Sequence, residues 1–349
     1  MTLVGCDLHA RRQQLAVLDT ATGELREEQL SHDGDAVERF YAALPPPVTV
    51  AVESTGYALW FHAVIRRLGH TLLVGDASKI RAMVVRKTKN DRRDALHLLD
   101  LLRHERLPLI WVPDPETRDL RTLLTHRMRL VRFRTAVMNG LHAMALSHRL
   151  VTGSKRLTRS RVAQLSRLAL PPHTARRRDE SLELMSWLAD RIRQLDVLVE
   201  RAVEVEPAAS RLLTHPGVGP VTALTTVVVL GPVSRFPGSK EVTSYVGLAP
   251  ALHASADTHH LGQITKQGNP LLRLVLVQAA SLAARYDEDL KHLYTVLSRR
   301  RGHAKAKVAI ARKLLVRLFI MLRDGIDYEE FRRRGRSHRL GEMHSAPAT

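Results

Sequence analysis

The sequence predicts an α/β domain at the N-terminus, a basic helical region after it, and a mainly helical domain in the second half. Two observations support this order. In residues 1–110, short runs of β-type residues alternate with helical patterns, which is typical of a sheet covered by helices. Beyond residue 110, apolar residues recur at spacings of three and four, which indicates helices.

The first domain is expected to be a mixed sheet with helices packed against it. Strands are expected at Thr2–Leu8, Gln14–Asp19, Glu24–Ser31, Val48–Val52 and His70–Asp76. Helices are expected at Asp35–Ala43, Ser54–Leu68 and Asp91–His104. Turn signals separate these segments, because a Thr-Gly pair follows the second strand and three prolines precede the fourth.

The second half is predicted to be helical, with one extended loop and a basic tail. Helices are expected at Glu116–Leu146, Ser181–Glu206, Ser239–Gly247, Asn269–Arg285 and Ala304–Arg323, and a loop is expected at Leu248–Leu261. The apolar spacing within Ser181–Glu206 fits either a coiled-coil seam or an amphipathic helix packed in its own domain.

Four divisions of the chain follow from these patterns. They are an α/β domain at 1–110, a basic helical and coiled-coil region at 111–207, a C-terminal domain at 208–328, and a basic tail at 329–349. The chain is predicted to be disordered from Phe331, because the residues after it are basic and lack periodicity.

The composition indicates a globular, cytoplasmic protein. Of 349 residues, 44% are hydrophobic, which is enough for two or three separate cores. The apolar runs are too short to span a bilayer, and the N-terminus has no signal-peptide layout. The single cysteine, Cys6, excludes an internal disulfide framework and a multi-cysteine zinc site.

The charge indicates a polyanionic partner. Lys and Arg number 54 against 35 acids, which gives a net charge of +19. Residues 120–178 contain 14 Lys or Arg and no acid, and residues 290–323 contain 10 and no acid. Such stretches suit a phosphate backbone. They lack the aromatic-rich apolar face of interfacial helices, so we expect nucleic acid and no membrane as the partner.

Two carboxylates mark the start of the last predicted helix of the first domain. Asp91 and Asp94 are three residues apart, so both lie on one face of one turn. Lys87, Lys89 and Arg92 surround them. The pair suits a divalent cation held between the acids, with a polyanion over the basic residues. The alternative is a solvated helix start whose acids favour the positive end of the helix dipole.

Two more acids lie on predicted strands. Asp7 lies on the first strand, where a buried and unpaired carboxylate costs several kcal/mol, and Glu53 lies at the tip of the fourth. Four carboxylates from separate segments can hold two Mg²⁺ ions about 4 Å apart for phosphodiester chemistry. Further along, Gly217 and Gly219 fit a helical hairpin whose backbone N–H groups hold a phosphate, although a plain helix–helix turn uses the same glycines.

These segments together resemble one family, the DEDD transposases of insertion sequences, which include pilin-gene-inverting and bridge-RNA-guided recombinases. The N-terminal motifs that carry the resemblance are Val4-Gly5-Cys6-Asp7, Val52-Glu53-Ser54-Thr55-Gly56 and Lys89-Asn90-Asp91-Arg92-Arg93-Asp94-Ala95. The C-terminal ones are His215-Pro216-Gly217-Val218-Gly219, Tyr245-Val246-Gly247-Leu248-Ala249-Pro250 and Gly262-Gln263-Ile264-Thr265-Lys266-Gln267-Gly268-Asn269. In order, they run over nearly the whole chain.

The resemblance implies a RuvC-like (RNase H-fold) nuclease domain and a second domain that carries a nucleophilic serine. Its acidic tetrad corresponds to Asp7, Glu53, Asp91 and Asp94, which hold Mg²⁺, with Mn²⁺ as a substitute. The serine that forms a phosphoserine intermediate with DNA corresponds to Ser255. Ala256 replaces the glycine that usually follows it, and Ser244 is the second candidate.

The resemblance also implies the activity and the partners. It implies a recombinase that moves an insertion sequence, acting on double-stranded donor and target DNA under the guidance of an RNA encoded by the element. The serine and the acids lie in different domains, so their site is completed either by domain closure or across subunits. The resemblance favours assembly across the subunits of a homo-oligomer, dimer or tetramer, with the Ser181–Glu206 seam as the candidate contact. Lys87, Lys89, Arg92, Lys266 and Arg273 are the candidate nucleic-acid contacts.

Two other functions stay open on the sequence alone. A metal-dependent nuclease of the Holliday-junction type needs the four acids and attacks with water, without Ser255. A non-catalytic nucleic-acid-binding scaffold needs neither, and its acids are structural.

Overall fold

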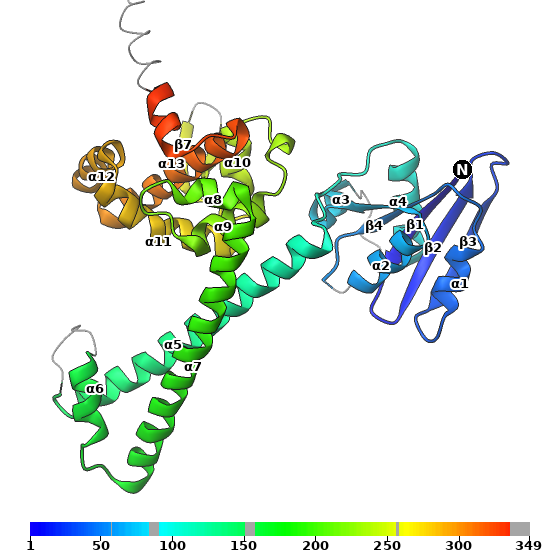
Figure 1. Ribbon diagram of the computed structural model, residues 1–349. Coiled ribbons are helices and arrows are strands. Elements are labelled where there is room, and N and C mark those ends of the chain that lie inside the picture. Colours follow the sequence, from blue (N-terminus) through cyan, green and yellow to red (C-terminus); the bar gives the residue numbers. More distant parts are fainter. Residues whose placement is uncertain (57, 84–90, 151–157, 256–257, 336–349) are drawn as a thin grey trace, which may run out of the picture. The chain divides into compact units, whose positions relative to one another are not determined.

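The computed structural model describes residues 1–56, 58–83, 91–150, 158–255 and 258–335. The chain forms two compact units, Met1–Val112 and Pro113–Thr349. The first unit is an α/β sheet structure, and the second is mostly helical (Figure 1). None of the helices in the described part of the chain combines the length and the apolar content that a membrane span needs.

The first unit is built on a five-stranded mixed sheet with the strand order β3-β2-β1-β4-β5. The strands β1, β2 and β3 form two antiparallel hairpins, and β4 and β5 continue the sheet parallel to β1. The strands are β1 (Thr2–Leu8), β2 (Arg12–Asp19), β3 (Leu25–Ser31), β4 (Val48–Glu53) and β5 (Thr71–Gly75), and the helices are α1 (Ala36–Ala42), α2 (Leu59–Arg67), α3 (Ala77–Met83) and α4 (Asp91–Arg103).

Helices cover both faces of this sheet. On one face, Tyr41 of α1 and Phe61 of α2 pack against Val4 and Cys6 of β1 in one core cluster. On the other face, Ile80 of α3 and the buried leucines of α4 pack against a second set of strand residues. Because side chains alternate along a strand, β1 divides its residues between the two layers. The predicted mixed sheet with helices against it is therefore confirmed.

Gly5 sets how closely α4 lies on the sheet. A Cβ at this position would come 2.5 Å from the amide nitrogen of Leu99 and closer still to the carbonyl oxygen of Ala95. Only glycine therefore allows the α4 backbone to lie against the middle of β1. Two residues further along the strand, on the same face, stands Asp7.

Several first-unit boundaries differ from those predicted. The helix α2 begins at Leu59 and not at Ser54. The helix α3 was not predicted, because Ala77–Met83 has a weak apolar pattern. It is started by Asp76, whose Oδ1 accepts hydrogen bonds from the amides of Ser78 and Lys79 at 2.9 and 3.1 Å.

The second unit contains most of the helices. They are α5 (Pro115–Ser147), α6 (Arg159–Ser166), α7 (Pro172–Val205), α8 (Pro207–Leu213), α9 (Pro220–Leu230), α10 (Ser239–Val246), α11 (Pro270–Tyr286), α12 (Glu288–Arg301) and α13 (His303–Asp324), with a short 3-10 helix at Val233–Arg235 and the strands β6 (Pro250–Ser255) and β7 (Thr258–Ile264). A further helical stretch covers residues 328–335.

The two longest helices, α5 and α7, lie side by side (Figure 1). Leu188 and Ile192 of α7 are buried against Leu130 of α5. The apolar seam in Ser181–Glu206 is therefore filled within the same chain. Of the two interpretations of this pattern, the structure shows the amphipathic helix packed in its own unit.

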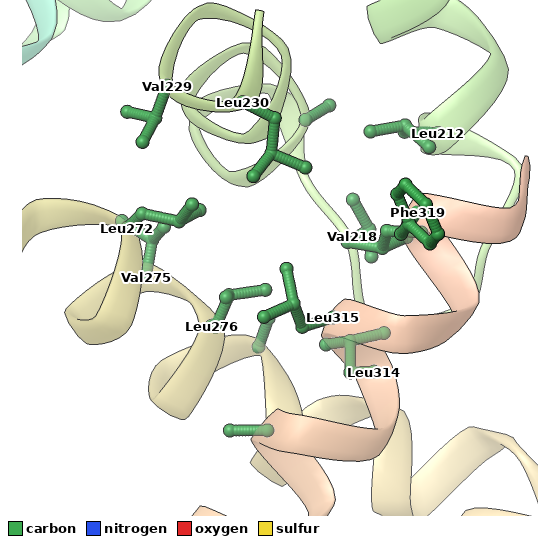
Figure 2. Close-up of a cluster of buried hydrophobic side chains, with 14 of the residues drawn as sticks. Leu212, Val218, Val229, Leu230, Leu272, Val275, Leu276, Leu314, Leu315 and Phe319 are labelled. Carbon is green, nitrogen blue, oxygen red and sulfur yellow. The ribbon is translucent and has the colours of Figure 1, made fainter. Parts of the chain in front are cut away.

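The main core of the second unit lies where α9, α11 and α13 meet. Figure 2 shows Leu230 of α9, Leu276 of α11 and Leu315 of α13 pointing toward one another, and all three are fully buried. Eight of the 11 residues of α9 are buried, as expected of a helix surrounded by others. This core holds the loops that follow α8 and α10 in place.

Three predictions for the second half are wrong. Leu248–Leu261 is not a loop, because β6 and β7 form an antiparallel hairpin there. The helix α12 was missed, and it is started by Asp287, whose Oδ1 accepts a 2.8 Å hydrogen bond from the Leu290 amide. Residues 331–335 are helical rather than disordered, since Phe331 stacks on Tyr328. Residues 336–349 lie outside the described residues.

Candidate metal site and serine hairpin

The end of β1 and the start of α4 bring two acids together. Asp7 and Asp91 face the same imidazole, that of His9: its Nε2 lies 3.1 Å from Oδ2 of Asp7 and 3.3 Å from Oδ2 of Asp91. One ligand atom from each of the three residues lies within 4.8 Å of the others. Residues 84 apart in the sequence thus form one compact group of oxygen and nitrogen donors.

The environment of this group suits a divalent cation. The Asp7 side chain is 16% exposed and the Asp91 side chain 32% exposed, so both carboxylates have lost part of their hydration. Nearby carboxylates repel each other, and a cation between them removes that repulsion. Arg12 adds one positive partner, since its Nη2 lies 3.0 Å from Oδ2 of Asp91.

The backbone places Glu53 beside Asp7. The strands β1 and β4 are parallel neighbours, and Cys6 is paired with Val52. Cys6 and Val52 both belong to the core on the α1 and α2 side. The next residue of each strand therefore faces the opposite side of the sheet, the side of α4. Asp7 and Glu53 thus lie at the same edge and on the same face as the Asp91 carboxylate.

Asp94 lies on the first turn of α4, one residue before the buried Ala95. The helical spacing places it near Asp91 on the part of α4 that turns toward the sheet. The structure thus joins Asp7 and Asp91 through His9. It puts Glu53 on the neighbouring strand end and Asp94 on the same helical turn as Asp91.

His9 was not predicted as part of the site. It follows β1, and its backbone N–H donates a 2.9 Å hydrogen bond to the carbonyl of Arg12 in the turn between β1 and β2. A signal for it was present, because residues two apart on an extended segment share a face. The pattern Asp7-Leu8-His9 therefore predicts that the two polar side chains point the same way.

The basic residues predicted around the acids have different surroundings. Lys87 and Lys89 lie outside the described residues. The guanidinium of Arg92 forms a two-pronged ion pair with Glu27 of β3, in which Nη2 lies 2.7 Å from Oε1. This hydrogen-bonded partner raises the pKa of Arg92.

Ser255 is the last residue of β6 and is paired with Thr258 across the hairpin. Ser244, the second candidate, is an exposed residue of α10. The histidines His259 and His260 lie on β7. The backbone of the hairpin, described at 250–255 and 258–264, therefore places Ser255 next to its tip.

Two sequence motifs meet at the base of this hairpin. Gly247, after α10, has a positive φ of 74°, and a Cβ there would lie 2.6 Å from the amide nitrogen of Gln267. Gly268 has a φ of 77°, and a Cβ there would lie 3.0 Å from the carbonyl carbon of Tyr245. The two glycines therefore allow the chain entering β6 and the chain leaving β7 to lie in direct contact.

Arg273 of α11 stabilises the contact between these two segments by hydrogen bonds. Its Nη1 donates to the carbonyl oxygens of Val246, Gln267 and Gly268 at 2.9, 2.6 and 3.2 Å. One nitrogen of the guanidinium is thus directed at the hairpin base rather than at solvent. Lys266 is exposed, has a positive φ of 57°, and donates its backbone N–H to the carbonyl of Gly247.

The predicted Gly-x-Gly hairpin lies between α8 and α9. Gly217 has a φ of 87°, and a Cβ there would lie 2.3 Å from the amide nitrogen of Ala283 on α11, an overlap that only glycine avoids. The preceding His215 is fully buried, and burial lowers its pKa to about 4. Gly217 is thus required by packing on α11, whatever else the loop does.

Comparisons with known proteins match both halves of the chain to transposases. The DEDD transposase model of the IS110 type matches residues 4–148, and the model of the transposase IS116/IS110/IS902 family matches residues 209–295. These two regions contain the acids at one end and Ser255 at the other. They define a transposase, an enzyme that acts on DNA.

Individual relatives agree. The chain is 30% identical to the transposase for insertion sequence element IS1111A of Coxiella burnetii, over 66% of this chain and 65% of the relative. It is 27% identical to the transposase for IS1328 of Yersinia enterocolitica, over 80% and 83%. It is 30% identical to the pilin gene-inverting protein of Moraxella lacunata, over 41% and 46%. The chain belongs to the IS110 family of DEDD transposases.

Membership of this family implies a divalent cation, and the donor set fits one. Carboxylate oxygens are the preferred ligands of hard divalent ions, and Asp7 and Asp91 present two of them in one group with His9.

Proposed function

We propose that the protein is the transposase of an insertion sequence, a recombinase that cleaves and rejoins strands of double-stranded donor and target DNA. The single observation that carries the proposal is the approach of α4 to β1 at Gly5, which puts Asp91 beside Asp7. In this proposal the first unit is an RNase H-like, RuvC-type nuclease domain. Asp7, Glu53, Asp91 and Asp94 hold Mg²⁺, for which Mn²⁺ can substitute.

The chemistry is a transfer of a phosphoryl group to serine and back. When bound, the metal supplies charge neutralisation at the scissile phosphate. The Ser255 hydroxyl loses its proton and its oxygen bonds to phosphorus, while the bond from phosphorus to a deoxyribose oxygen breaks and that oxygen takes up a proton. Attack by another strand's hydroxyl on the phosphoserine reverses these changes and rejoins DNA without loss of a high-energy bond.

The acids and Ser255 belong to different compact units, Met1–Val112 and Pro113–Thr349. We propose that the complete site forms only when two parts meet, by closure of one chain or between chains of a dimer or tetramer. The seam of α7 is occupied by α5, so the candidate contact is the outward face of α7. Leu184, Trp187 and Leu198 are 46, 50 and 46% exposed there.

We also propose that a structured RNA encoded by the element selects the DNA. The support is the acid-free segment 120–178, in which Arg129 and Arg132 of α5 are exposed, and the exposed Arg299–Arg301 at the end of α12. Not every cation of this segment is available, since Arg121 donates a 2.8 Å hydrogen bond to the Val228 carbonyl. In this proposal the helical hairpin around Gly217, together with Lys266, contacts DNA phosphates.

The four divisions 1–110, 111–207, 208–328 and 329–349 enter the proposal as functional parts. They are nuclease, RNA-binding and oligomerising helices, serine domain, and basic tail. Deleting 329–349 tests the last part, with the expected result that nucleic-acid affinity falls while strand cleavage at saturating DNA is retained.

The serine is tested with a DNA substrate that is nicked so that cleavage traps the protein on it. We expect the wild-type protein and the Ser244→Ala variant to give a protein–DNA adduct that survives denaturation in detergent. The Ser255→Ala variant should give none. Cleavage of equal rate by Ser255→Ala would overturn the serine route.

One alternative function has specific support, because the first unit contains all four acids without any contribution from the second. This is a metal-dependent nuclease that uses water. It predicts full cleavage by Ser255→Ala and no adduct in any variant. Asp91→Asn and Asp94→Asn separate both enzymes from a non-catalytic scaffold, because unchanged cleavage in these variants would show that the acids are structural.

A further inference from the structure

His9 lies between Asp7 and Asp91, and one nitrogen atom of its imidazole faces both carboxylates. Its Nε2 atom is buried from solvent, although the whole side chain is 32% exposed. The atom lies 3.1 and 3.3 Å from the two carboxylate oxygens. The Nε2 atom of the imidazole thus points toward the two carboxylates and away from water.

These separations match those of ligands that share one metal ion. Two neighbouring ligands of an octahedral ion, each about 2.1 Å from it and at right angles, lie about 3 Å apart. Both distances from Nε2 are close to this value. The imidazole nitrogen therefore has the spacing of a ligand adjacent to each of the two carboxylate oxygens, which themselves lie within 4.8 Å of each other.

The backbone that carries His9 is fixed on two sides. The His9 N–H donates to the Arg12 carbonyl, and the His32 N–H, at the end of β3, donates to the Arg11 carbonyl, both at 2.9 Å. The turn between β1 and β2 is therefore tied to the neighbouring hairpin. A side chain on such a turn is positioned by the sheet rather than by a free loop.

We propose that His9 is a nitrogen ligand of the catalytic divalent cation, next to the carboxylates of Asp7 and Asp91; this rests on the proposed metal-dependent function. A nitrogen ligand favours Mn²⁺ over Mg²⁺, because Mg²⁺ strongly prefers oxygen and imidazole suits transition metals. The site is thus of mixed oxygen and nitrogen type. Arg12, which bonds to Asp91 from outside the group, orients that carboxylate.

The competing role for His9 is that of a hydrogen-bond donor that holds the two carboxylates without binding metal. The two roles differ in one observable quantity, the distance between the imidazole nitrogen and the bound ion. A metal-bound nitrogen produces ¹⁴N modulation in the electron spin echo of Mn²⁺, and a nitrogen that only donates a hydrogen bond to a ligand does not.

The test uses the full chain with one equivalent of Mn²⁺ and no DNA. Electron spin echo spectra are recorded for wild type, His9→Gln, His32→Gln and Asp7→Asn. His32 is the matched control, because it belongs to the same turn region but its Nδ1 lies 3.4 Å from the Ala10 carbonyl, away from the acids. Calorimetric titration of each protein with Mn²⁺ and with Mg²⁺ gives the two affinities.

We expect ¹⁴N modulation in wild type and His32→Gln and none in His9→Gln. The His9→Gln change should weaken Mn²⁺ binding about tenfold and Mg²⁺ binding by a smaller factor. Modulation that is absent from wild type, or that persists in His9→Gln, overturns the proposal for His9. If Mn²⁺ binds wild type and Asp7→Asn equally, the metal site of the proposed function fails, and His9 fails with it.

Discussion

The two units of the molecule use the same device, a glycine that lets two backbones touch, for different ends. In the first unit, Gly5 lets α4 lie on β1, so a regular helix meets a regular strand. In the second unit, Gly247 and Gly268 join two loop segments at the base of the β6–β7 hairpin. The first contact gathers the acids, and the second closes the hairpin that carries Ser255.

The difference lies in what keeps each contact in place. The contact at Gly5 is held by the buried leucines of α4, which belong to a hydrophobic core. The contact at Gly247 and Gly268 is held by hydrogen bonds, three from the Arg273 guanidinium and one from the Lys266 amide to the Gly247 carbonyl, beside the buried Val246 and Leu248. Apolar burial spread over several residues is harder to disrupt than one set of hydrogen bonds. We therefore expect the acidic site to be rigid and the serine hairpin to be the more easily loosened part.

The largest expected effect follows from Gly5→Ala. The new methyl overlaps the α4 backbone at Ala95 and Leu99, so the helix must move off the sheet. We expect the first unit to lose about 3 kcal/mol in free energy of unfolding. Urea titration measures it, with tryptophan fluorescence in a Trp187→Phe background, so that Trp60 and Trp111 report on the first unit.

The matched control for Gly5→Ala is Gly56→Ala. A Cβ at Gly56 meets nothing within 4 Å, so this variant should unfold at the wild-type urea concentration. Gly5→Ala should also bind Mn²⁺ more weakly, because Asp91 moves with α4. A stable Gly5→Ala variant with unchanged metal affinity would show that the close approach does not position the acids.

The units also differ in the buried groups that titrate. The first unit buries Cys6 and Tyr41, and desolvation raises the pKa of both groups. The second unit buries His215, whose pKa desolvation lowers to about 4. Each group is neutral in the folded protein. We therefore expect the first unit to lose stability in alkali and the second to lose it in acid.

The second largest expected effect is the loss of stability of the second unit at acidic pH. The pKa of His215 is about 4 in the folded chain and 6.5 ordinarily, so the unfolded chain binds the proton more tightly. Stability is complete above pH 6.5 and is lost as the pH falls toward 4. Between pH 7 and pH 5 we expect a loss of about 2 kcal/mol. The groups that face His215 are Arg317, Asp287 and Tyr328.

Urea titrations measure this loss of stability. They use a Trp60→Phe, Trp111→Phe background, in which Trp187 reports on the second unit. The control is His215→Asn, which removes the titrating imidazole and keeps an N–H donor for the Pro216 carbonyl, 2.9 Å from Nδ1. Its stability should vary less between pH 7 and pH 5 than that of the wild-type chain. Equal slopes in the two proteins would contradict the role of His215.

The expected loss of stability of the first unit at alkaline pH is smaller over the pH range that can be measured. The ordinary pKa of the Cys6 thiol is 9.0, and in the folded chain it is higher, so only the unfolded chain releases the proton above pH 9. Stability of the first unit should fall as the pH rises, by about 1 kcal/mol at pH 10. In Cys6→Ala the slope between pH 8.5 and pH 10 should be reduced. A first unit whose stability is independent of pH in this range would contradict the assignment.

The same contrast explains what the sequence could predict. The strand Thr2–Leu8 has both its predicted ends, because alternation and turn signals are local. The helix α4 covers Asp91–Arg103 of the described residues, within the predicted Asp91–His104. The hairpin β6–β7 was predicted as a loop. At its base Gly247 lies against Gln267 and Gly268 lies against Tyr245, residues that are distant in the sequence. Local patterns contain no trace of such a contact.

The site residues also divide into those that the sequence could predict and those whose surroundings depend on tertiary packing. Asp7 and Asp91 were predicted from their residue type and position, and the structure places them in one group with His9. The metal-binding roles of Glu53 and Asp94 and the nucleophilic role of Ser255 stay predictions. Arg273 was predicted as a phosphate contact beside Ser255. Its direction toward three carbonyls depends on the packing of α11, which no pattern around residue 273 specifies.

The smallest effect on overall stability, and the sharpest test of the contrast, is expected for Arg273→Lys. A lysine keeps the charge, but its side chain is one bond shorter than that of arginine, so its ammonium falls short of the place from which Nη1 bonds the carbonyls of Val246, Gln267 and Gly268. We expect a global loss below about 1 kcal/mol. Amide hydrogen exchange of the β6–β7 backbone should nevertheless become faster, because the base of the hairpin opens. The exchange of α4 should stay as in wild type.

If Arg273 acted only on phosphates, Arg273→Lys would weaken DNA binding and leave hairpin exchange unchanged. Faster amide exchange combined with slower formation of the Ser255 adduct would show that the position of Ser255 depends on the Arg273 hydrogen bonds. The position of the acids, in contrast, depends on a hydrophobic core.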